Sequence, residues 1–379
     1  MTEWKTYKLG DVATFQTGKL NSNEAVENGK YPFFTCSPNT LSIDTYAFDK
    51  EAILLAGNNA EGNFSIKYYK GKFNAYQRTY IIETYNDICD IKYLFYALKL
   101  CLQKFKQMSQ GTSTKFLTAV ILNNFEISLP PLAEQRRIVG ILGAIDDKIE
   151  NNRRINTNLE LQAQALFDNL MSNSNVEYKL IADIDHIIET GRRPKGGVAN
   201  ITSGVPSIGA ENIKGLGKYD YSKTKYITAE FAETLKKGII KGYELLIYKD
   251  GGKPGYFIPN FSIFGEGFPY DNMTLNEHVF LLDFGNKGYN FFAYFYMQTE
   301  EVMKYLNAQG SKAAIPGINR NDVENISIPT IEDEAVKEFC ERIEPIITPI
   351  LVNSKESSRL ATLRDTLLLK LMNGEIKTE

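Results

Sequence analysis

The sequence predicts an α+β protein in which two mixed, mainly β globular modules are joined by two long helices. The helices are expected to form an antiparallel coiled coil, and the whole chain a pseudo-twofold internal repeat. Two observations predict this class. A segment near the middle of the chain recurs near its end, and each copy leads into apolar residues at heptad spacing. Short apolar runs bounded by Gly or Asn occupy the rest of each half, as strands ending in turns do.

The repeat is clearest where each module ends. The stretch "QGTSTKFLTAVILNNFEISLP" at 110–130 aligns without a gap with "QGSKAAIPGINRNDVENISIP" at 309–329. Upstream, "YKLGDVATFQTGK" resembles "YKLIADIDHIIETGRRPK". The chain is therefore interpreted as two copies of one unit, a module followed by a helix. We place the four segments at 1–131, 132–174, 175–330 and 331–379.

Each module is predicted to contain short strands, a helix and a closing strand. Strands are predicted at "AILLAGN" and "QRTYIIET" in the first module, and at "ELLIYKDGG" and "HVFLLDFG" in the second. A helix follows in each half, at "IKYLFYALKLCLQKFKQ" and at "NFFAYFYMQTEEVMKYLN". A glycine loop, "QGTS" or "QGSK", then precedes the last strand.

The two long helices carry apolar residues in steps of three and four, the pattern of a coiled-coil seam. Pro130 and Pro131 suit the positions before the first helix, and Glu134 complements its dipole. Because a module separates the helices, antiparallel packing is the simplest arrangement. A plain interdomain helix packed into a core is the alternative. The expected seam residues are Ile138, Leu142, Ile145, Ile149, Leu159 and Leu166 in the first helix, and Ile346, Ile350, Leu360 and Leu367 in the second.

Polar residues and prolines interrupt the two seams. Asn152 and Asn156 fall at seam positions, where polar groups can fix register and partner at some cost in stability. Pro345 and Pro349 fall inside the second pattern. A proline removes a helix hydrogen bond, so we expect a kink or break there and a continuous helix from about Pro349 to Asn373.

Composition excludes several classes. A formal net charge of −3 over 379 residues gives no global attraction for nucleic acid, so any DNA binding must come from local patches. Four cysteines without CxxC spacing and two histidines argue against a metal site or a disulfide scaffold. The N-terminus lacks the apolar run of a signal peptide, and no stretch is long and apolar enough to span a membrane. We expect a cytoplasmic protein with no membrane partner.

Two helical segments carry a resemblance to a known family. "SLPPLAEQRRIVGILGAIDDKIE" and the C-terminal "LATLRDTLLLKLMNGEI" closely resemble the two helical regions of the DNA specificity subunits of type I restriction–modification systems. The resemblance covers the whole chain in the order module, helix, module, helix. The second junction, "SIPTIEDEAVKEF", is a degraded copy of the first.

The resemblance implies a non-catalytic subunit with two target recognition domains. Each domain would read one half of a bipartite DNA target, and the coiled coil would set the spacing between the halves. Two methyltransferase subunits, which bind S-adenosylmethionine, would join this chain, and two restriction subunits can join that complex. The chain itself would bind no cofactor. A twofold-like protein on DNA also predicts half-sites at a fixed separation.

Side chains that reach base edges or phosphates are expected in four groups of loops and strands. The first is "ETGRRPKGG" with its counterpart "QTGKLNSN", where solvated turn charges are the alternative. The second is "AGNNAEGN" and "YKDGGKPGYF", which plain hairpin turns explain equally well. The third is "NAYQRTY", in which the arginine could instead be half of a salt bridge. The fourth is the matched pair "QGTSTK" and "QGSKAA".

The candidate DNA contacts are Lys19, Asn21, Asn58, Asn59, Gln77, Arg78, Ser113 and Lys115 in the first module, and Arg192, Arg193, Lys195, Lys249, Lys253, Tyr256, Ser311 and Lys312 in the second. No nucleotide-binding, methyltransferase or nucleophile-elbow motif is present in the sequence. His186 and His278 are interpreted as ordinary surface or core histidines. The chain is therefore expected to catalyse nothing. The rival hypothesis is a scaffold whose modules bind other proteins.

Overall fold

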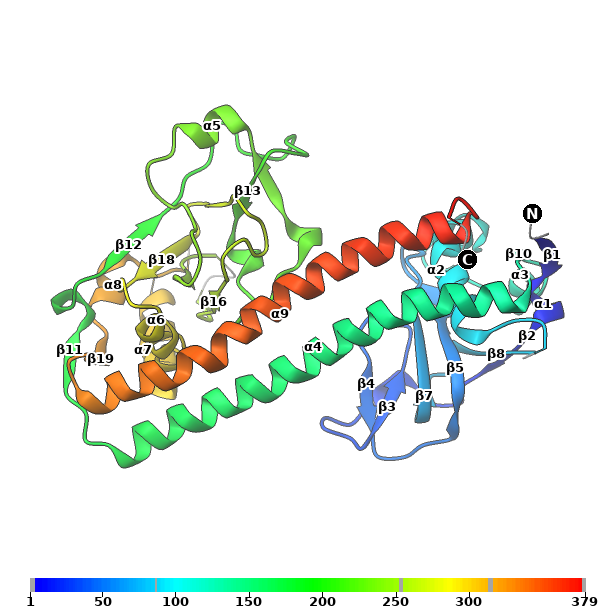
Figure 1. The fold of residues 1–379 in the computed structure, drawn as a ribbon, viewed down its shortest axis with the longest axis horizontal. Helices are drawn as coiled ribbons and strands as arrows, with labels where there is room; N and C mark the ends of the chain where they lie inside the picture. Colours follow the sequence, from blue (N-terminus) through cyan, green and yellow to red (C-terminus); the bar gives the residue numbers. More distant parts are fainter. Residues whose placement is uncertain (1–3, 86, 252–254, 313–315, 377–379) are drawn as a thin grey trace. The chain divides into compact units, whose positions relative to one another are not determined.

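The computed structural model describes residues 4–85, 87–251, 255–312 and 316–376. The chain divides into two compact units, one formed by Met1–Asp146 with Thr362–Glu379 and the other by Asp147–Ala361. Each unit holds one module together with segments of both long helices (Figure 1).

The first unit is built on a mainly antiparallel sheet. Among its described residues the sheet has six strands in the order β2 (Ala13–Thr17), β8 (Thr79–Thr84), β5 (Phe48–Ala56), β7 (Ile66–Ala75), β3 (Tyr31–Phe34) and β4 (Leu41–Ile43). The pairing of β3 with β7 is parallel, and the other pairings are antiparallel. The short helices α1 (Leu9–Val12) and α3 (Ala119–Asn123) lie near the two ends of the module sequence.

Helix α2 (Ile91–Met108) packs against this sheet through one apolar face. The Asp90 side chain begins the helix by accepting hydrogen bonds from the N–H groups of Lys92 and Tyr93. Tyr93 and Phe105 are then buried on the face turned to the core. The helix predicted in the first half is therefore present as one continuous element.

The second unit contains smaller sheets. In the described part, one sheet has the order β12 (Ile187–Thr190), β18 (Val279–Asp283), β15 (Leu245–Tyr248) and β16 (Phe261–Ile263). A second has the order β14 (Lys225–Ile227), β13 (Val205–Ile208) and β17 (Thr274–Leu275). The short helices α5 (Ala229–Glu233) and α8 (Arg320–Glu324) lie between strands.

The helix predicted at "NFFAYFYMQTEEVMKYLN" is two helices, α6 (Lys287–Tyr296) and α7 (Glu300–Gly310). The reason is local, because Thr299 takes the extended backbone of an N-cap and the two acidic residues after it begin a new first turn. The glycine loop predicted at "QGSK" is also wrong, since Gln309 and Gly310 belong to α7 and Ser311 is its C-cap.

The internal repeat is visible in how each module closes. Strand β1 (Lys5–Lys8) pairs antiparallel with β10 (Glu126–Leu129), and β11 (Tyr178–Leu180) pairs in the same way with β19 (Ser327–Pro329). Each module thus brings its first strand against its last, and the long helix follows. The predicted fold class, two α+β modules with an internal repeat and two long helices, is confirmed.

The long helices are α4 (Leu132–Asn173) and α9 (Glu334–Met372), and they pair antiparallel within each unit. In the first unit, Asp146 of α4 forms an ion pair with Arg364 of α9, with Oδ1 and Nη1 2.8 Å apart. In the second, the rings of Phe167 and Phe339 meet edge to face at 6.1 Å between centroids. The predicted antiparallel coiled coil is therefore present.

The predicted seam residues are all buried or partly buried. Ile138, Leu142 and Ile350 are at most 1% exposed. The partly buried members are Ile145, Ile149, Leu159, Leu166, Ile346, Leu360 and Leu367. Their role in setting a DNA spacing stays a prediction.

The expected break at Pro345 and Pro349 is wrong, because α9 runs through both prolines from its start at Glu334. Each proline removes one backbone donor, which costs helix stability. Ile343, Ile347 and Ile350 beside them are buried in the core of the second unit, and this packing offsets the loss.

The motif "PPLAEQ" anchors α4 to the first module through its glutamine. Gln135 is 1% exposed. Its Oε1 accepts a hydrogen bond from the Asp90 N–H at 2.9 Å, and its Nε2 donates to the Ile88 carbonyl at 3.0 Å and the Pro130 carbonyl at 2.9 Å. A different residue anchors the second junction. Asp333 accepts hydrogen bonds from the N–H groups of Glu177 and Ala335, which join module and helix.

Candidate nucleic-acid interface

In the first module, the structure brings the predicted contact segments together where β2 and β5 end and β8 begins. Gln77 Nε2 donates to Asn21 Oδ1 at 2.9 Å, so two predicted groups touch directly. Strand β6 (Asn58–Asn59) pairs antiparallel with β9 (Lys115–Phe116), so the predicted segments "AGNNAEGN" and "QGTSTK" also meet. The Arg78 guanidinium lies 5.2 Å from the centre of the Phe116 ring. This contact connects the segment "NAYQRTY" to the strand that follows "QGTS".

The side chains in this cluster differ in their exposure to solvent and in the contacts that they already make. Lys19, Arg78 and Ser113 are exposed. Arg78 forms no ion pair among the residues that the structure describes, so the salt-bridge alternative finds no partner there. Asn59 is committed to its own loop, because its Oδ1 accepts hydrogen bonds from the Glu61 and Asn63 N–H groups, both at 2.9 Å. For Asn59 the hairpin-turn interpretation therefore describes the observed contacts.

In the second module, the segments equivalent to β6 and β9 also meet. Gly251 N donates to the Pro316 carbonyl at 2.9 Å, and Ile318 N donates to the Lys249 carbonyl at 2.8 Å. In both modules the segment that follows the helices thus returns to the residues after a sheet strand. These are the residues after β5 in the first module and after β15 in the second. Lys253 lies outside the described residues. Lys312 Nζ donates to Gln309 Oε1 at 2.7 Å, while Tyr256 is 61% exposed.

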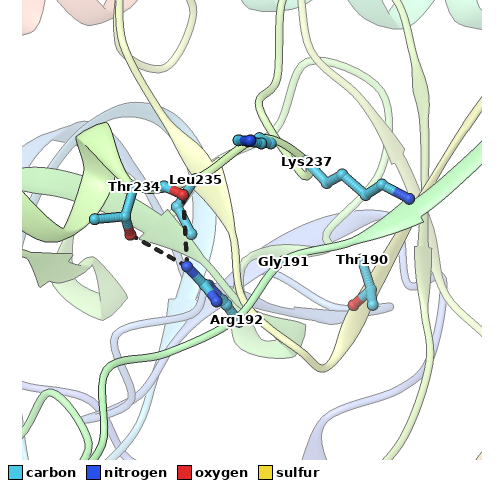
Figure 2. Close-up of a pocket in the computed structure, with 7 residues that line it drawn as sticks. Thr190, Gly191, Arg192, Thr234, Leu235 and Lys237 are labelled. Atoms are coloured by element: carbon cyan, nitrogen blue, oxygen red, sulfur yellow. Dashed lines mark hydrogen bonds between the residues drawn. The ribbon is translucent and has the colours of Figure 1, made fainter.

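Arg192 lines a cavity of about 450 Å³, together with residues from a second loop. Its Nη2 donates to Thr234 Oγ1 at 3.2 Å (Figure 2). Its guanidinium also lies 5.5 Å from the centre of the Phe231 ring. Lys236 and Lys237 line the same cavity. Sequence reasoning missed this lysine pair, although "LKKG" is a basic pair before a glycine, the pattern used for the other loops.

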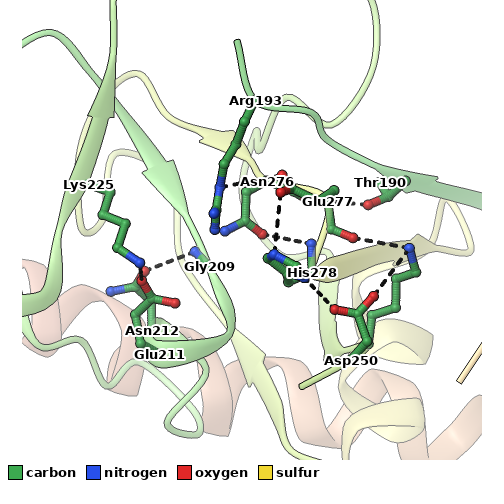
Figure 3. A network of polar contacts seen from close by, with 11 residues as sticks. Thr190, Arg193, Gly209, Glu211, Asn212, Lys225, Asp250, Asn276, Glu277 and His278 are labelled. Carbon is green, nitrogen blue, oxygen red and sulfur yellow. Dashed lines mark hydrogen bonds and ion pairs between the residues drawn. The ribbon is translucent and has the colours of Figure 1, made fainter. Parts of the chain in front are cut away.

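Arg193 lies instead in a polar network with Glu277, His278 and Asp250 (Figure 3), and Lys249 contacts the same network. Arg193 Nε is 3.4 Å from Glu277 Oε2, and Lys249 Nζ is 3.6 Å from Asp250 Oδ2. His278 connects the two acids, since its Nδ1 contacts Asp250 and its Nε2 is 3.3 Å from Glu277 Oε1. The charges of Arg193 and Lys249 are therefore compensated inside the module.

A second ion pair in Figure 3 joins Lys225 Nζ to Glu211 Oε1 at 2.6 Å. Burial raises the pKa of the Glu211 carboxyl, but the hydrogen bond from Lys225, a backbone hydrogen bond and the positive charges of Lys225 and Arg193 together hold the pKa below its usual value. Glu211 is thus ionised at neutral pH and compensates Lys225. Lys195 is exposed next to Gly196 and Gly197, both with positive φ, so its loop follows a path that favours glycine.

No group of three or more His, Cys, Asp or Glu side chains in the described part of the chain is arranged to hold a metal ion. Among the same residues, no helix combines the length and apolar character needed to cross a membrane.

Comparisons with known proteins agree with this architecture. Residues 1–161 match the family model of the type I restriction modification DNA specificity domain. The chain is 26% identical to the type I restriction enzyme EcoDI specificity subunit of Escherichia coli, over 100% of this chain and 89% of that protein. It is 24% identical to the MjaIX specificity subunit of Methanocaldococcus jannaschii, over 76% of this chain and 69% of that protein.

Over its whole length the chain is similar to type I restriction–modification specificity subunits. The resemblance seen in the two helical segments is thereby confirmed. A crystal structure of a type I restriction–modification S subunit from M. genitalium superimposes with a TM-score of 0.65 at 16% identity, covering 98% of this chain and 96% of that one. This likeness shows the fold. The family model covers the first module and much of α4, and the relative from E. coli extends the match through the second module.

Proposed function

We propose that this chain is the DNA sequence-specificity subunit of a type I restriction–modification complex. One observation carries the proposal. The chain matches specificity subunits over its whole length, and it consists of two modules closed by the same strand pairing and each continued by a long helix. Each module reads one half of a bipartite duplex target, and the paired helices set the distance between the halves.

The chain catalyses nothing in this proposal. Adenine methylation belongs to two methyltransferase subunits, which bind S-adenosylmethionine and dock on this chain, and two restriction subunits can join that complex. The resemblance of "PPLAEQ" and "LRDTLL" to the family's helical regions supports docking along α4 and α9. The chain requires no cofactor for recognition, since hydrogen bonds and charge are sufficient to read DNA.

In the first module, DNA contact is proposed for the cluster around Arg78, Gln77 and Asn21. Arginine reads guanine bidentately, and Gln and Asn read adenine. The contact between Arg78 and Phe116 holds the guanidinium while leaving it exposed, which supports a reading role. In the second module, the exposed Lys195 and Tyr256 are proposed contacts, and Arg192 is considered further below.

A polar layer supports the spacing role of the helices. Asn152 is fully buried, and its Nδ2 donates to Glu356 Oε2 at 2.7 Å. Four residues further along α4, Asn156 donates to the Ile350 carbonyl at 3.1 Å and accepts from Asn353 Nδ2 at 2.9 Å. Buried asparagines that find partners in only one alignment penalise helices that slide, so this layer fixes the register on which a constant gap depends.

The proposal is tested by purifying the chain after co-expression with its neighbouring methyltransferase and selecting duplexes from a random library. The expected result is co-purification of the two proteins and enrichment of two short half-sites separated by a constant gap. Co-purification without any enriched DNA sequence would support the protein scaffold instead. The control replaces the exposed Lys304 of α7 by Ala and should leave selection unchanged.

A further inference from the structure

The cations of the second module fall into two groups. Arg193, Lys249 and Lys225 are each paired with a carboxylate of the same module. Arg192, Lys236 and Lys237 are not, because none of them forms an ion pair with a described residue. These three uncompensated cations line one cavity. Figure 2 labels Arg192 and Lys237 among its lining residues.

Backbone packing holds the two cation-bearing loops together. Gly191 N donates to the Asn276 carbonyl, and the Gly238 carbonyl accepts from Leu275 N at 2.7 Å, so both loops are bonded to strand β17 and the residue after it. A Cβ on Gly191 would lie 1.7 Å from the Leu275 carbonyl oxygen. A Cβ on Gly238, whose φ is +68°, would lie 2.8 Å from the Gly191 Cα. The approach therefore requires glycine at both positions.

The arginine is positioned before any ligand arrives. Arg192 donates to Thr234 and lies over the Phe231 ring, and both contacts orient the guanidinium without neutralising it. Glu189 of β12 does not line the cavity, and its Oε2 accepts a hydrogen bond from the Gly238 N–H at 2.8 Å. Glu230 and Glu233 lie on the adjoining α5 and are exposed. The residues that line the cavity include these three cations and no acidic side chain.

Positive charges that line one cavity raise the local concentration of anions there. We propose that Arg192, Lys236 and Lys237 form a phosphate-binding site that holds the backbone of duplex DNA against the second module. The inference rests on the proposed function and deepens it, since it assigns these residues to positioning rather than to base reading. Arginine and lysine are the side chains that bind phosphodiester oxygens through charge-assisted hydrogen bonds.

The test measures DNA binding by the full chain in complex with its methyltransferase as a function of salt concentration. The double variant Lys236→Gln, Lys237→Gln is compared with Lys223→Gln, Lys304→Gln, which removes the same charge at exposed positions of the same unit outside the two long helices. Each phosphate contact contributes about 0.9 to the slope of log affinity against log salt. The cavity variant should lose roughly 1.8 from the slope and on the order of tenfold in low-salt affinity, for cognate and unrelated duplexes alike.

Two further measurements, on Arg192 variants and on competition by inorganic phosphate, test the same site. Arg192→Lys should retain most of the affinity that Arg192→Ala loses, and inorganic phosphate at constant ionic strength should not compete, because a single free phosphate lacks the adjoining DNA contacts. An unchanged slope in the cavity variant, a loss confined to the cognate duplex, or an equal loss in the Lys223 and Lys304 control would overturn the site. If the unmodified complex binds no DNA at all, the proposed function fails and the site fails with it. Thermal unfolding of each variant identifies those that have lost their fold.

Discussion

The side-chain carbonyl of Gln135 accepts a hydrogen bond from the backbone N–H of Asp90 at 2.9 Å, across 45 residues of sequence. The same glutamine donates to the carbonyls of Ile88 and Pro130, so one buried side chain joins the start of α4 to the loop that precedes α2. These three hydrogen bonds explain why the motif "PPLAEQ" ends in a glutamine. A residue that satisfies three backbone groups at once fixes the direction in which the long helix leaves the first module.

Replacing Gln135 by Ala should destabilise the first unit. The substitution leaves a buried N–H and two carbonyls without their partner, at a cost of about 3 kcal/mol in the free energy of unfolding. Denaturant unfolding of the full chain measures this. Arg136→Ala, at the exposed neighbouring position, is the control and should change stability by less than about 0.5 kcal/mol. Equal effects of the two substitutions would contradict the anchoring role.

Replacing Asn152 by Leu should stabilise the helix pair rather than weaken it. Asn152 is fully buried and its Oδ1 has no hydrogen-bond partner among the described residues, whereas its partner Glu356 can return to solvent. We expect a gain of about 1 kcal/mol in unfolding free energy, as for polar residues in coiled-coil seams. Thermal unfolding of Asn152→Leu, compared with the unsubstituted chain and with the exposed control Asn151→Leu, measures this change. A clear loss of stability would mean that Asn152 stabilises the pair rather than specifying its register.

The second junction should respond to acid through Asp333. Hydrogen bonds from the Glu177 N–H, and from the first N–H groups of α9, hold the pKa of Asp333 below its usual value. A depressed pKa contributes stability that is fully present above the unfolded-state pKa and is lost as pH falls through the folded-state pKa. Unfolding followed from pH 6 downward should therefore show a smaller acid loss in Asp333→Asn than in the unsubstituted chain, in roughly the pH range below 4. Parallel curves for the two proteins would contradict this assignment.

Replacing Arg78 by Ala should weaken recognition by the first module. Loss of a guanidinium that reads a base costs about 1–3 kcal/mol for the cognate duplex and relaxes the sequence preference at one position. Competition binding with single-base variants of the target measures both effects. Lys30→Ala, an exposed cation of the same unit, is the control. A loss of equal size for every duplex would instead assign Arg78 to a phosphate.

Periodicity was sufficient to predict the modules and the long helices, because the heptads and the repeated module ends are local signals. The packing around the prolines of α9 was not predictable, since the cost of Pro345 and Pro349 is local while the burial of Ile343 and Ile347 that offsets it depends on the fold.

The site was predictable only as a set of loops. Sequence patterns selected segments that do converge, as the contact between Gln77 and Asn21 shows. They could not distinguish Arg192 from its neighbour Arg193, because the carboxylate that compensates Arg193 comes from Glu277, distant in sequence. The lysine pair at 236–237 was missed because the cavity exists only once Gly238 packs against Gly191.

The central claim is that this chain selects the DNA sequence that its complex methylates. Mapping of N6-methyladenine in cells that express the neighbouring methyltransferase, with and without this chain, tests it most directly. We expect a split motif, methylated in both halves, that appears only when the chain is present, and whose first half alone loses definition in Arg78→Ala. A motif that is unchanged when the chain is absent would contradict the account.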